Sequence, residues 1–241
     1  PRPALHYTWQ AGLAAARALG PQARCTIATD DQSIADLAAA EGMAVVMTPT
    51  SCANGTERCA AALAALGEDP EIIVNLQGDA PLIPAAMVAA VVARLETDPG
   101  LAMATVAVPA SPVVLAHLQA DAAAGRVGGT TVVCSSAGRA LYFSKSIIPH
   151  VSPGATPNQS VLLHLGLYAY RPAALADYAA RAPAPIEMQE GLEQLRFLDA
   201  GLPVGVAICA APGWEMIELN NPGDIALIEP ELARRAALEP A

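Results

Sequence analysis

Three polar residues directly follow a strongly apolar segment of the chain and could bind a ligand. Residues 71–76 have the pattern of a buried β-strand, and Gln77, Gly78 and Asp79 come immediately after it. In open α/β sheets, ligands bind beyond the carboxyl ends of the strands, and a glycine there lets a ligand approach the backbone closely. The Asp79 carboxylate would be well placed to hold Mg²⁺ against phosphate oxygens. The alternative is that Asp79 only caps the following turn.

A second polar group opens a predicted helix. Asn54 and Gly55 form a turn signal, Thr56 could cap the helix, and Arg58 falls in its first turn. Because a cation is disfavoured at a helix N-terminus, an arginine there is more reasonable if it meets an anion such as phosphate. The alternative is an exposed Arg58 that pairs with Glu57 or another acidic neighbour.

Polar and aromatic residues alternate along a predicted strand over residues 162–170. Side chains two positions apart share a face of a strand, so His164, Gly166 and Tyr168 lie on one face. A histidine and a tyrosine flanking a glycine in this way predict the floor of a ligand site. A lone histidine in a strand is more often structural, and that interpretation also stays open.

The remaining candidates are a single lysine and a polar pair. Of the 13 basic residues only Lys145 is a lysine, so it either has a specific role or is an ordinary surface residue. Glu193 and Gln194 fall in a helix predicted over residues 187–200. The leucines of that helix face the core, so Glu193 and Gln194 point elsewhere, toward a ligand or toward solvent.

The elements that must position these residues alternate between strand and helix, which predicts an α/β fold. Strands are expected over residues 24–29, 43–48, 71–76, 102–109, 162–170 and 204–210, and helices over 33–41, 57–66, 84–96, 187–200 and 222–235. Two strands around residues 136–138 predict a hairpin. We expect one domain over residues 1–241 with a mixed, mostly parallel sheet. Residues 126–170 are expected to form an antiparallel insertion that serves as a lid or a dimer surface.

Composition excludes several classes of function. The net charge of −10 and the pI near 4.7 argue against nucleic-acid binding, because a polyphosphate would be repelled. No apolar stretch is long enough to span a bilayer. The five cysteines show no zinc-site spacing, which favours reduced thiols and a cytoplasmic protein.

Five motifs in order resemble one family. Along the chain these are NGTER, QGD followed after one residue by PLI, ALYFSK, HLGLYAYR and LEQLR. This set is similar to that of the bacterial CMP-Kdo synthetases, the 3-deoxy-manno-octulosonate cytidylyltransferases, from residue 1 to the last helix. The resemblance implies a Rossmann-like nucleotidyltransferase domain of the glycosyltransferase-A type, a homodimer, and transfer of CMP from CTP to the acidic sugar Kdo with release of pyrophosphate.

The same resemblance implies roles for individual residues. Asn54, Gly55, Arg58 and Gln77 would line the cytidine and ribose site, Asp79 would bind Mg²⁺, and Lys145, His164, Tyr168, Glu193 and Gln194 would form the acceptor pocket. We expect Asp79 and Lys145 to take part in catalysis. Lys145 stands where the family has an arginine, so it would hold the acceptor carboxylate with a point charge rather than a bidentate fork.

Some positions depart from the family pattern. Ala80 replaces a glutamate, Thr131 stands where the family has a lysine, and Asn220 replaces an aspartate that serves as a second metal ligand. Asn220 would offer a neutral carbonyl oxygen to the metal. The family also opens with a strand and a phosphate loop of on the order of 20 residues before the position that Pro1 matches. We therefore expect the sequence to lack that segment at its start.

These departures leave two alternatives open. The acceptor could be another small acid, such as an amino-Kdo, a sialic-type sugar or a phosphonate. The chain could also be a non-catalytic relative that binds a nucleotide, for which Asn220 is the strongest argument.

Overall fold

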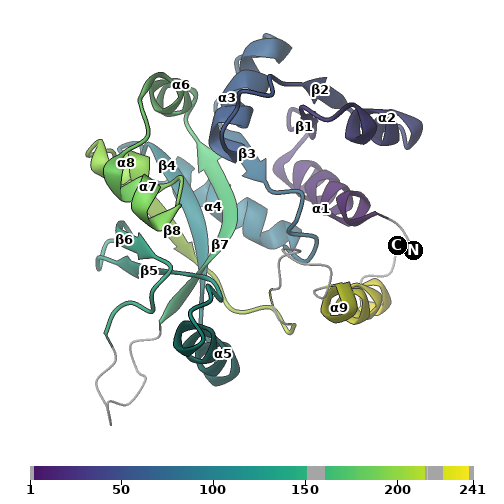
Figure 1. Cartoon of the computed structure of the whole chain (residues 1–241). Coiled ribbons are helices and arrows are strands. Elements are labelled where there is room, and N and C mark those ends of the chain that lie inside the picture. Colours follow the sequence, from purple (N-terminus) through teal and green to yellow (C-terminus); the bar gives the residue numbers. More distant parts are fainter. Residues whose placement is uncertain (1–2, 151–160, 215, 217–224, 239–241) are drawn as a thin grey trace.

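The computed structural model describes residues 3–150, 161–214, 216 and 225–238, which form an α/β structure around a six-stranded sheet (Figure 1). Its strands are β3 (Ile73–Leu76), β4 (Met103–Pro109), β5 (Thr130–Cys134), β6 (Ala140–Ser144), β7 (Leu162–Tyr170) and β8 (Val204–Ile208). They follow the order β6-β5-β7-β4-β8, and β3 also pairs with β7. The expected mixed sheet and the expected hairpin, β5–β6, are both confirmed.

Strand β7 organises this sheet. Along one edge it pairs with the whole of β4, and along the other with β5 near its start and β3 near its end. Strands β3, β4, β5 and β8 run in one direction, and β6 and β7 run in the other. Because β7 lies centrally, most pairings are antiparallel, so the expectation that the mixed sheet is mostly parallel is wrong.

A second, separate sheet contains the parallel strands β1 (Ile27–Thr29) and β2 (Val45–Met47). Within the described ranges, β1 pairs only with β2 and β3 pairs only with β7. Backbone pairing requires strands about 4.8 Å apart, and no described strand bridges β1 and β3. The single sheet that was expected is therefore divided into two.

Helices cover both faces of the large sheet. On one face α4 (Ala85–Glu96) buries its apolar side against β4 and β7, and α1 (Ala4–Leu19) packs on α4. On the other face lie α3 (Gly55–Leu66), α6 (Pro172–Ala180), α7 (Pro185–Glu190) and α8 (Leu195–Asp199). The chain also forms α2 (Gln32–Ala40), α5 (Pro112–Ala123) and α9 (Ile225–Leu238). Among the described helices, none combines the length and apolarity needed to cross a membrane.

Two apolar cores follow from the alternation of side chains along the strands. Leu165 and Leu167 of β7 belong to the core beneath α4, whereas Tyr168 and Tyr170 belong to the core beneath α3, α6 and α8. Tyr170 stacks on Phe197 of α8 with ring centroids 5.9 Å apart. Both faces of β7 are thus buried, so this strand is a rigid support for the residues that lie on it and at its ends.

One predicted helix is wrong in a way that matters for the site. Residues 187–200 do not form a single helix, because α7 ends at Glu190, just before Gly191, and α8 begins at Leu195. Gly191 has φ of +62°, a left-handed conformation that ends a helix and that glycine adopts without steric cost. Glu193 and Gln194 therefore lie in a turn between two short helices, and Gln194 is buried rather than solvated.

Candidate functional site

Parallel strands bring their carboxyl ends to one edge of the large sheet, and Asp79 lies at that edge. Gln77, Gly78 and Asp79 follow β3 as predicted, and Gly78 is exposed: a Cβ added there would approach only a Leu5 methyl group, at 4.0 Å. The Asp79 Oδ1 atom is buried and has no hydrogen-bond partner. Burial raises the pKa of Asp79 above its ordinary value. Such an oxygen is an acceptor that lacks the cation or donor it needs.

The first turn of α3 is held by its own cap. Asn54, not Thr56, is the N-cap: its Oδ1 accepts from the Glu57 backbone N–H at 2.9 Å. The Asn54 Nδ2 group donates to the Tyr178 hydroxyl at 3.0 Å. Both ends of the Asn54 amide are therefore engaged within the protein, so its expected place in the nucleotide site stays a prediction.

Glu193 reaches from the α7–α8 turn to the N-terminus of α3. Its carboxylate accepts from the backbone N–H groups of Gly55 and Thr56 at 3.3 and 2.9 Å, and from the Thr56 hydroxyl at 2.7 Å. A carboxylate is stabilised at a helix N-terminus by the unpaired N–H groups and by the helix dipole. The structure thus joins the NGTER and LEQLR motifs, which lie 138 residues apart at Gly55 and Glu193.

Arg58 lies at the ends of β1 and β2. Its guanidinium contacts the Asp30 carboxylate at 3.1 Å and donates to the Thr48 hydroxyl at 2.7 Å. An acidic neighbour therefore does pair with Arg58, but it is Asp30 and not Glu57. These contacts hold the guanidinium beside the small sheet, so its expected place in the nucleotide site with Gln77 stays a prediction.

His164 and Tyr168 share one face of β7, as predicted, and their rings lie 5.5 Å apart. The Thr105 hydroxyl donates to the Leu167 carbonyl at 2.8 Å and lies 2.9 Å from His164 Nε2. Because a hydroxyl has one proton, His164 Nε2 must carry the hydrogen of that second bond. Burial lowers the pKa of His164 to about 3, so the imidazole is neutral near pH 7.

Gln194 connects this floor to the α7–α8 turn. Its Oε1 accepts from the Tyr168 hydroxyl at 3.4 Å. Its side chain is buried, and its Nε2 group has no hydrogen-bond partner. The structure therefore brings Tyr168, Glu193 and Gln194 together, as expected, and leaves one amide donor available.

Lys145 follows β6 and is exposed. Its Nζ atom lies 2.7 Å from the position that a Cβ on Gly191 would occupy, so the ammonium group sits over the end of α7. The Glu190 carboxylate anchors this corner, because it accepts from the Ser144 hydroxyl at 2.7 Å and from the Lys145 backbone N–H at 3.0 Å. Lys145 is thus held beside the turn that carries Glu193 and Gln194.

A buried ion pair connects the two helices that flank the α7–α8 turn. Arg196 makes two contacts with the Glu187 carboxylate, at 2.7 and 2.6 Å, and a third with Glu57 at 3.2 Å. The guanidinium also stacks 3.9 Å from the Tyr178 ring centroid. Sequence reasoning missed this network and Glu190, because only the fold shows that these distant charges are neighbours.

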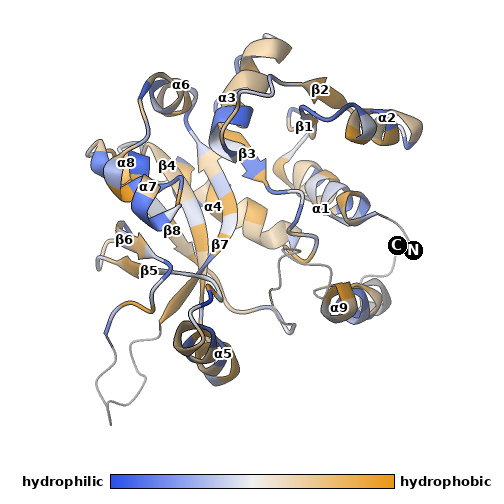
Figure 2. Ribbon diagram, viewed as in Figure 1, coloured by the Kyte–Doolittle hydropathy of each residue, from blue (hydrophilic) through white to orange (hydrophobic). Residues whose placement is uncertain are grey.

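Asn75 was also missed, although its position offered a signal. It is a single polar side chain within the apolar strand β3, and in the fold it is 8% exposed with an unpaired Nδ2 group. Figure 2 shows hydrophilic colour where β3 meets the first turn of α3, and again on α7 and α8. Polar groups therefore gather on this side of an otherwise apolar sheet.

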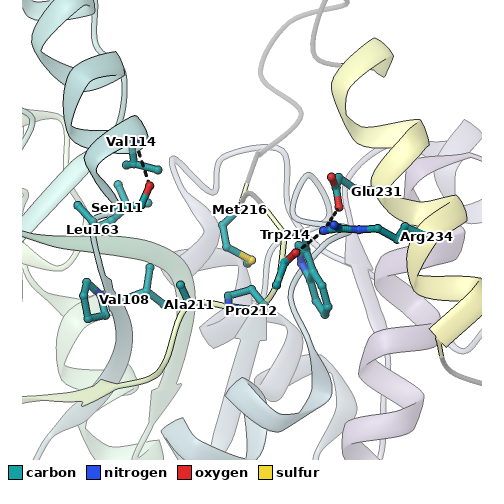
Figure 3. A pocket seen from close by; sticks show the side chains of 13 residues that line it. Val108, Ser111, Val114, Leu163, Ala211, Pro212, Trp214, Met216, Glu231 and Arg234 are labelled. Carbon is teal, nitrogen blue, oxygen red and sulfur yellow. Dashed lines mark hydrogen bonds and ion pairs between the residues drawn. The ribbon is translucent and has the colours of Figure 1, made fainter.

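A separate cavity of about 330 Å³ lies beyond the ends of β4 and β8, beside α5 and α9 (Figure 3). Most of its lining is apolar, including Val108, Leu163 and Trp214. Its charged residues, Glu231 and Arg234, pair with each other at 2.7 Å. The two charged side chains of this cavity thus neutralise each other.

The described part of the chain contains no group of three or more His, Cys, Asp or Glu side chains that could hold a metal ion. Asp79 is the described member of the predicted metal site, and Asn220 lies outside the described residues. An oxygen ligand without a partner suits Mg²⁺, which takes one or two protein carboxylates and completes its shell with water and phosphate.

Comparisons with known proteins agree on one family. A family model described as Cytidylyltransferase matches residues 3–208. A 3-deoxy-manno-octulosonate cytidylyltransferase of Maricaulis maris is 42% identical, over 89% of this chain and 83% of the relative. One from Chlamydia abortus is 38% identical, over 86% of this chain and 76% of the relative.

Solved structures agree with these relatives. A structure of CMP:2-keto-3-deoxy-manno-octonic acid synthetase complexed with CTP superposes with a TM-score of 0.78 at 28% identity, covering 97% of this chain and 89% of the other. The 4-diphosphocytidyl-2C-methyl-D-erythritol synthase of Anaerococcus prevotii, at 14% identity and a TM-score of 0.56, covers 97% of this chain and 90% of the other and shares the fold. The chain therefore belongs to the cytidylyltransferase family, and within it to the 3-deoxy-manno-octulosonate cytidylyltransferases.

Proposed function

We propose that this protein transfers CMP from CTP to Kdo and releases pyrophosphate. A hydroxyl oxygen of the sugar forms a bond to the α-phosphorus, the bond from that phosphorus to the bridging oxygen of pyrophosphate breaks, and the hydroxyl proton is lost. This reaction needs the two substrates to be held in line and the phosphate charge to be neutralised. It requires no covalent intermediate with the protein.

One observation carries this proposal: a buried Asp79 oxygen without a partner lies at the carboxyl end of β3, in a chain whose relatives are named as Kdo cytidylyltransferases. That edge is where ligands bind in open α/β sheets. The proposal further assigns the nucleotide to the side of Gly55 and Gln77, and the sugar to the side of Tyr168 and Gln194. Lys145 would face the carboxylate of the sugar.

We further propose that the reaction depends on Mg²⁺ and that Asp79 ligates the ion. When bound, Mg²⁺ would neutralise phosphate charge and orient the triphosphate. Support comes from the unpaired Asp79 Oδ1 and from the oxygen chemistry that Mg²⁺ prefers. We retain Asn220 as the proposed second ligand and a homodimer as the proposed assembly.

The direct test measures pyrophosphate release from CTP and Kdo in the presence of Mg²⁺. We expect release with this pair, and little release with UTP, with ATP or without acceptor. Tight CTP binding without pyrophosphate release when Kdo is the acceptor would instead indicate another acid acceptor. Binding of CTP without pyrophosphate release from any acid acceptor tested would support the non-catalytic alternative.

Asp79→Asn tests the metal role separately. We expect this variant to lose nearly all turnover while it keeps its fold, because the change is isosteric and removes the charge that would hold the ion. Asp36→Asn, on the exposed side of α2, is the matched control and should keep normal turnover. Normal turnover of Asp79→Asn would remove Asp79 from the metal site.

A further inference from the structure

Asn75 occupies an unusual position for an amide side chain. It lies in the middle of β3, is 8% exposed, and its Nδ2 group is buried without a hydrogen-bond partner. An unpaired buried donor costs free energy relative to an apolar side chain of the same shape. A strand within an apolar core would be more stable with leucine or valine here, so the amide must be explained by something other than folding.

The neighbours of Asn75 are the residues of the candidate site. In the sheet Asn75 pairs with Tyr168, and directly paired residues project to the same face. Beside the first turn of α3, a Cβ placed on Gly55 would lie 3.1 Å from Asn75 Nδ2. The same position is 3.7 Å from Gln77 Nε2 and 3.8 Å from Glu193 Oε1. Asn75 thus lies between the floor formed by β7 and the first turn of α3.

A second unpaired donor belongs to a residue that contacts the same tyrosine. Gln194 is 2% exposed, its Oε1 accepts from the Tyr168 hydroxyl at 3.4 Å, and its Nε2 group has no partner. Asn75, paired with Tyr168 in the sheet, and Gln194, bonded to the Tyr168 hydroxyl, therefore present two buried amide donors near the same tyrosine. Two such donors require acceptor oxygens, and within the described residues neither finds one.

We propose that Asn75 is a sugar-recognition residue whose Nδ2 group donates a hydrogen bond to an oxygen of the acidic acceptor, alongside Gln194. This proposal rests on the proposed function and extends it, because it adds a specificity residue from β3 to the acceptor side. The acceptor carries a carboxylate and several hydroxyls, all of which can accept from an amide N–H. The Nδ2 donor has no partner in the free protein, and the sugar supplies that partner when it binds.

Asn75→Leu is the decisive variant, since leucine matches the shape of asparagine and removes both polar atoms. We expect the KM for Kdo to rise about ten- to a hundredfold, the KM for CTP to change less than about twofold, and Tm to stay equal or rise. Thr105→Val provides the stability contrast. The Thr105 hydroxyl already has partners in His164 and Leu167, so its loss should lower Tm.

A direct probe of wild-type protein covers the case in which the leucine variant does not fold. The side-chain NH₂ resonances of Asn75, assigned by their loss in Asn75→Ser, should move downfield when Kdo is added to protein that holds CMP. The same resonances should not move when CMP is added alone.

The outcomes separate the two proposals. If wild-type protein releases no pyrophosphate from CTP and Kdo, the proposed function fails. If wild-type protein turns over but Asn75→Leu keeps its KM for Kdo, or if only the KM for CTP rises, the role of Asn75 is overturned. A large fall in Tm with both KM values unchanged would make Asn75 a structural residue and would also overturn it.

Discussion

Replacing Arg196 by methionine should destabilise the protein strongly, because it would strand a buried carboxylate. The side chains of Arg196 and Glu187 are 2% and 8% exposed in their ion pair. Removing one partner of such a pair leaves an uncompensated charge and costs about 3–5 kcal/mol. For a chain of this size, each kcal/mol lowers Tm by roughly 2–4 °C. We therefore expect a fall in Tm of roughly 10 °C.

Thermal unfolding followed by circular dichroism at pH 7 measures this effect, with Arg181→Met as the matched control. Arg181 also pairs with a carboxylate, that of Asp177, but these two side chains are 46% and 40% exposed. Exposed pairs contribute about 0–1 kcal/mol, so the control should change Tm by a few degrees at most.

A double variant isolates the buried charge as the cause. Adding Glu187→Met to Arg196→Met removes the stranded carboxylate, so a substantial part of the lost stability should return. The recovery should be incomplete, because Arg196 also contacts Glu57 and the Tyr178 ring. If Arg196→Met lowers Tm no more than Arg181→Met does, the reasoning about this network is wrong.

Three further predictions concern the site itself. Burial raises the pKa of Asp79, so its contribution to stability is present at low pH and is lost as pH rises through the folded-state pKa. Metal-free Asp79→Asn should therefore have a higher Tm than metal-free wild type at pH 7. Thermal scans at lower pH should show this difference in Tm vanishing below about pH 4. Gly191→Ala should raise the KM for Kdo, because the added methyl group would displace the Lys145 ammonium. Gly67→Ala is the control: Gly67 has φ of +64° with nothing within 4 Å, so this variant should share only the backbone cost of about 1 kcal/mol. Equal KM values for Kdo in the two variants would contradict this prediction. The folded-state pKa of His164 is lowered from 6.5 to about 3, so its contribution to stability is present above pH 6.5 and is lost progressively toward pH 3. NMR of the imidazole should find His164 neutral at pH 5. Titration of His164 near pH 6.5 would refute its burial.

Much of the fold could be predicted from local patterns. The strand over residues 162–170 and the hairpin around Gly138 were located closely, because apolar alternation and glycine turns are local signals. The helix over residues 187–200 was wrong, since the leucine stripe continues across the break and only the left-handed conformation of Gly191 ends α7. Helices α5 and α6 were not identified, although Pro112 and Pro172 stand at their starts.

The candidate site could be predicted only in part. Tyr168 and Gln194 were expected together and do contact each other, because the motifs that carry them are specific to the family. The pairing of Arg58 with Asp30 could not be specified, because it depends on how β1 lies relative to α3, and the expected place of Arg58 in the nucleotide site stays a prediction. Asn75 was assigned no role, because a lone polar residue in a strand becomes informative only when its burial and its missing partner are known.

The sequence by itself determined the alternation of strands and helices, the family, and the residue types available for chemistry, because each of these depends on local pattern or on ordered motifs. The tertiary structure alone decided which of those residues meet. Glu193 accepts hydrogen bonds from the first turn of α3 across 138 residues of chain, and Arg196 neutralises Glu187. Asn75 and Gln194 keep unpaired donors near Tyr168. The physical reason is that burial and hydrogen bonding depend on which residues pack against each other. For residues distant in sequence, strand pairing in the sheet determines these neighbours, and local conformational propensity does not.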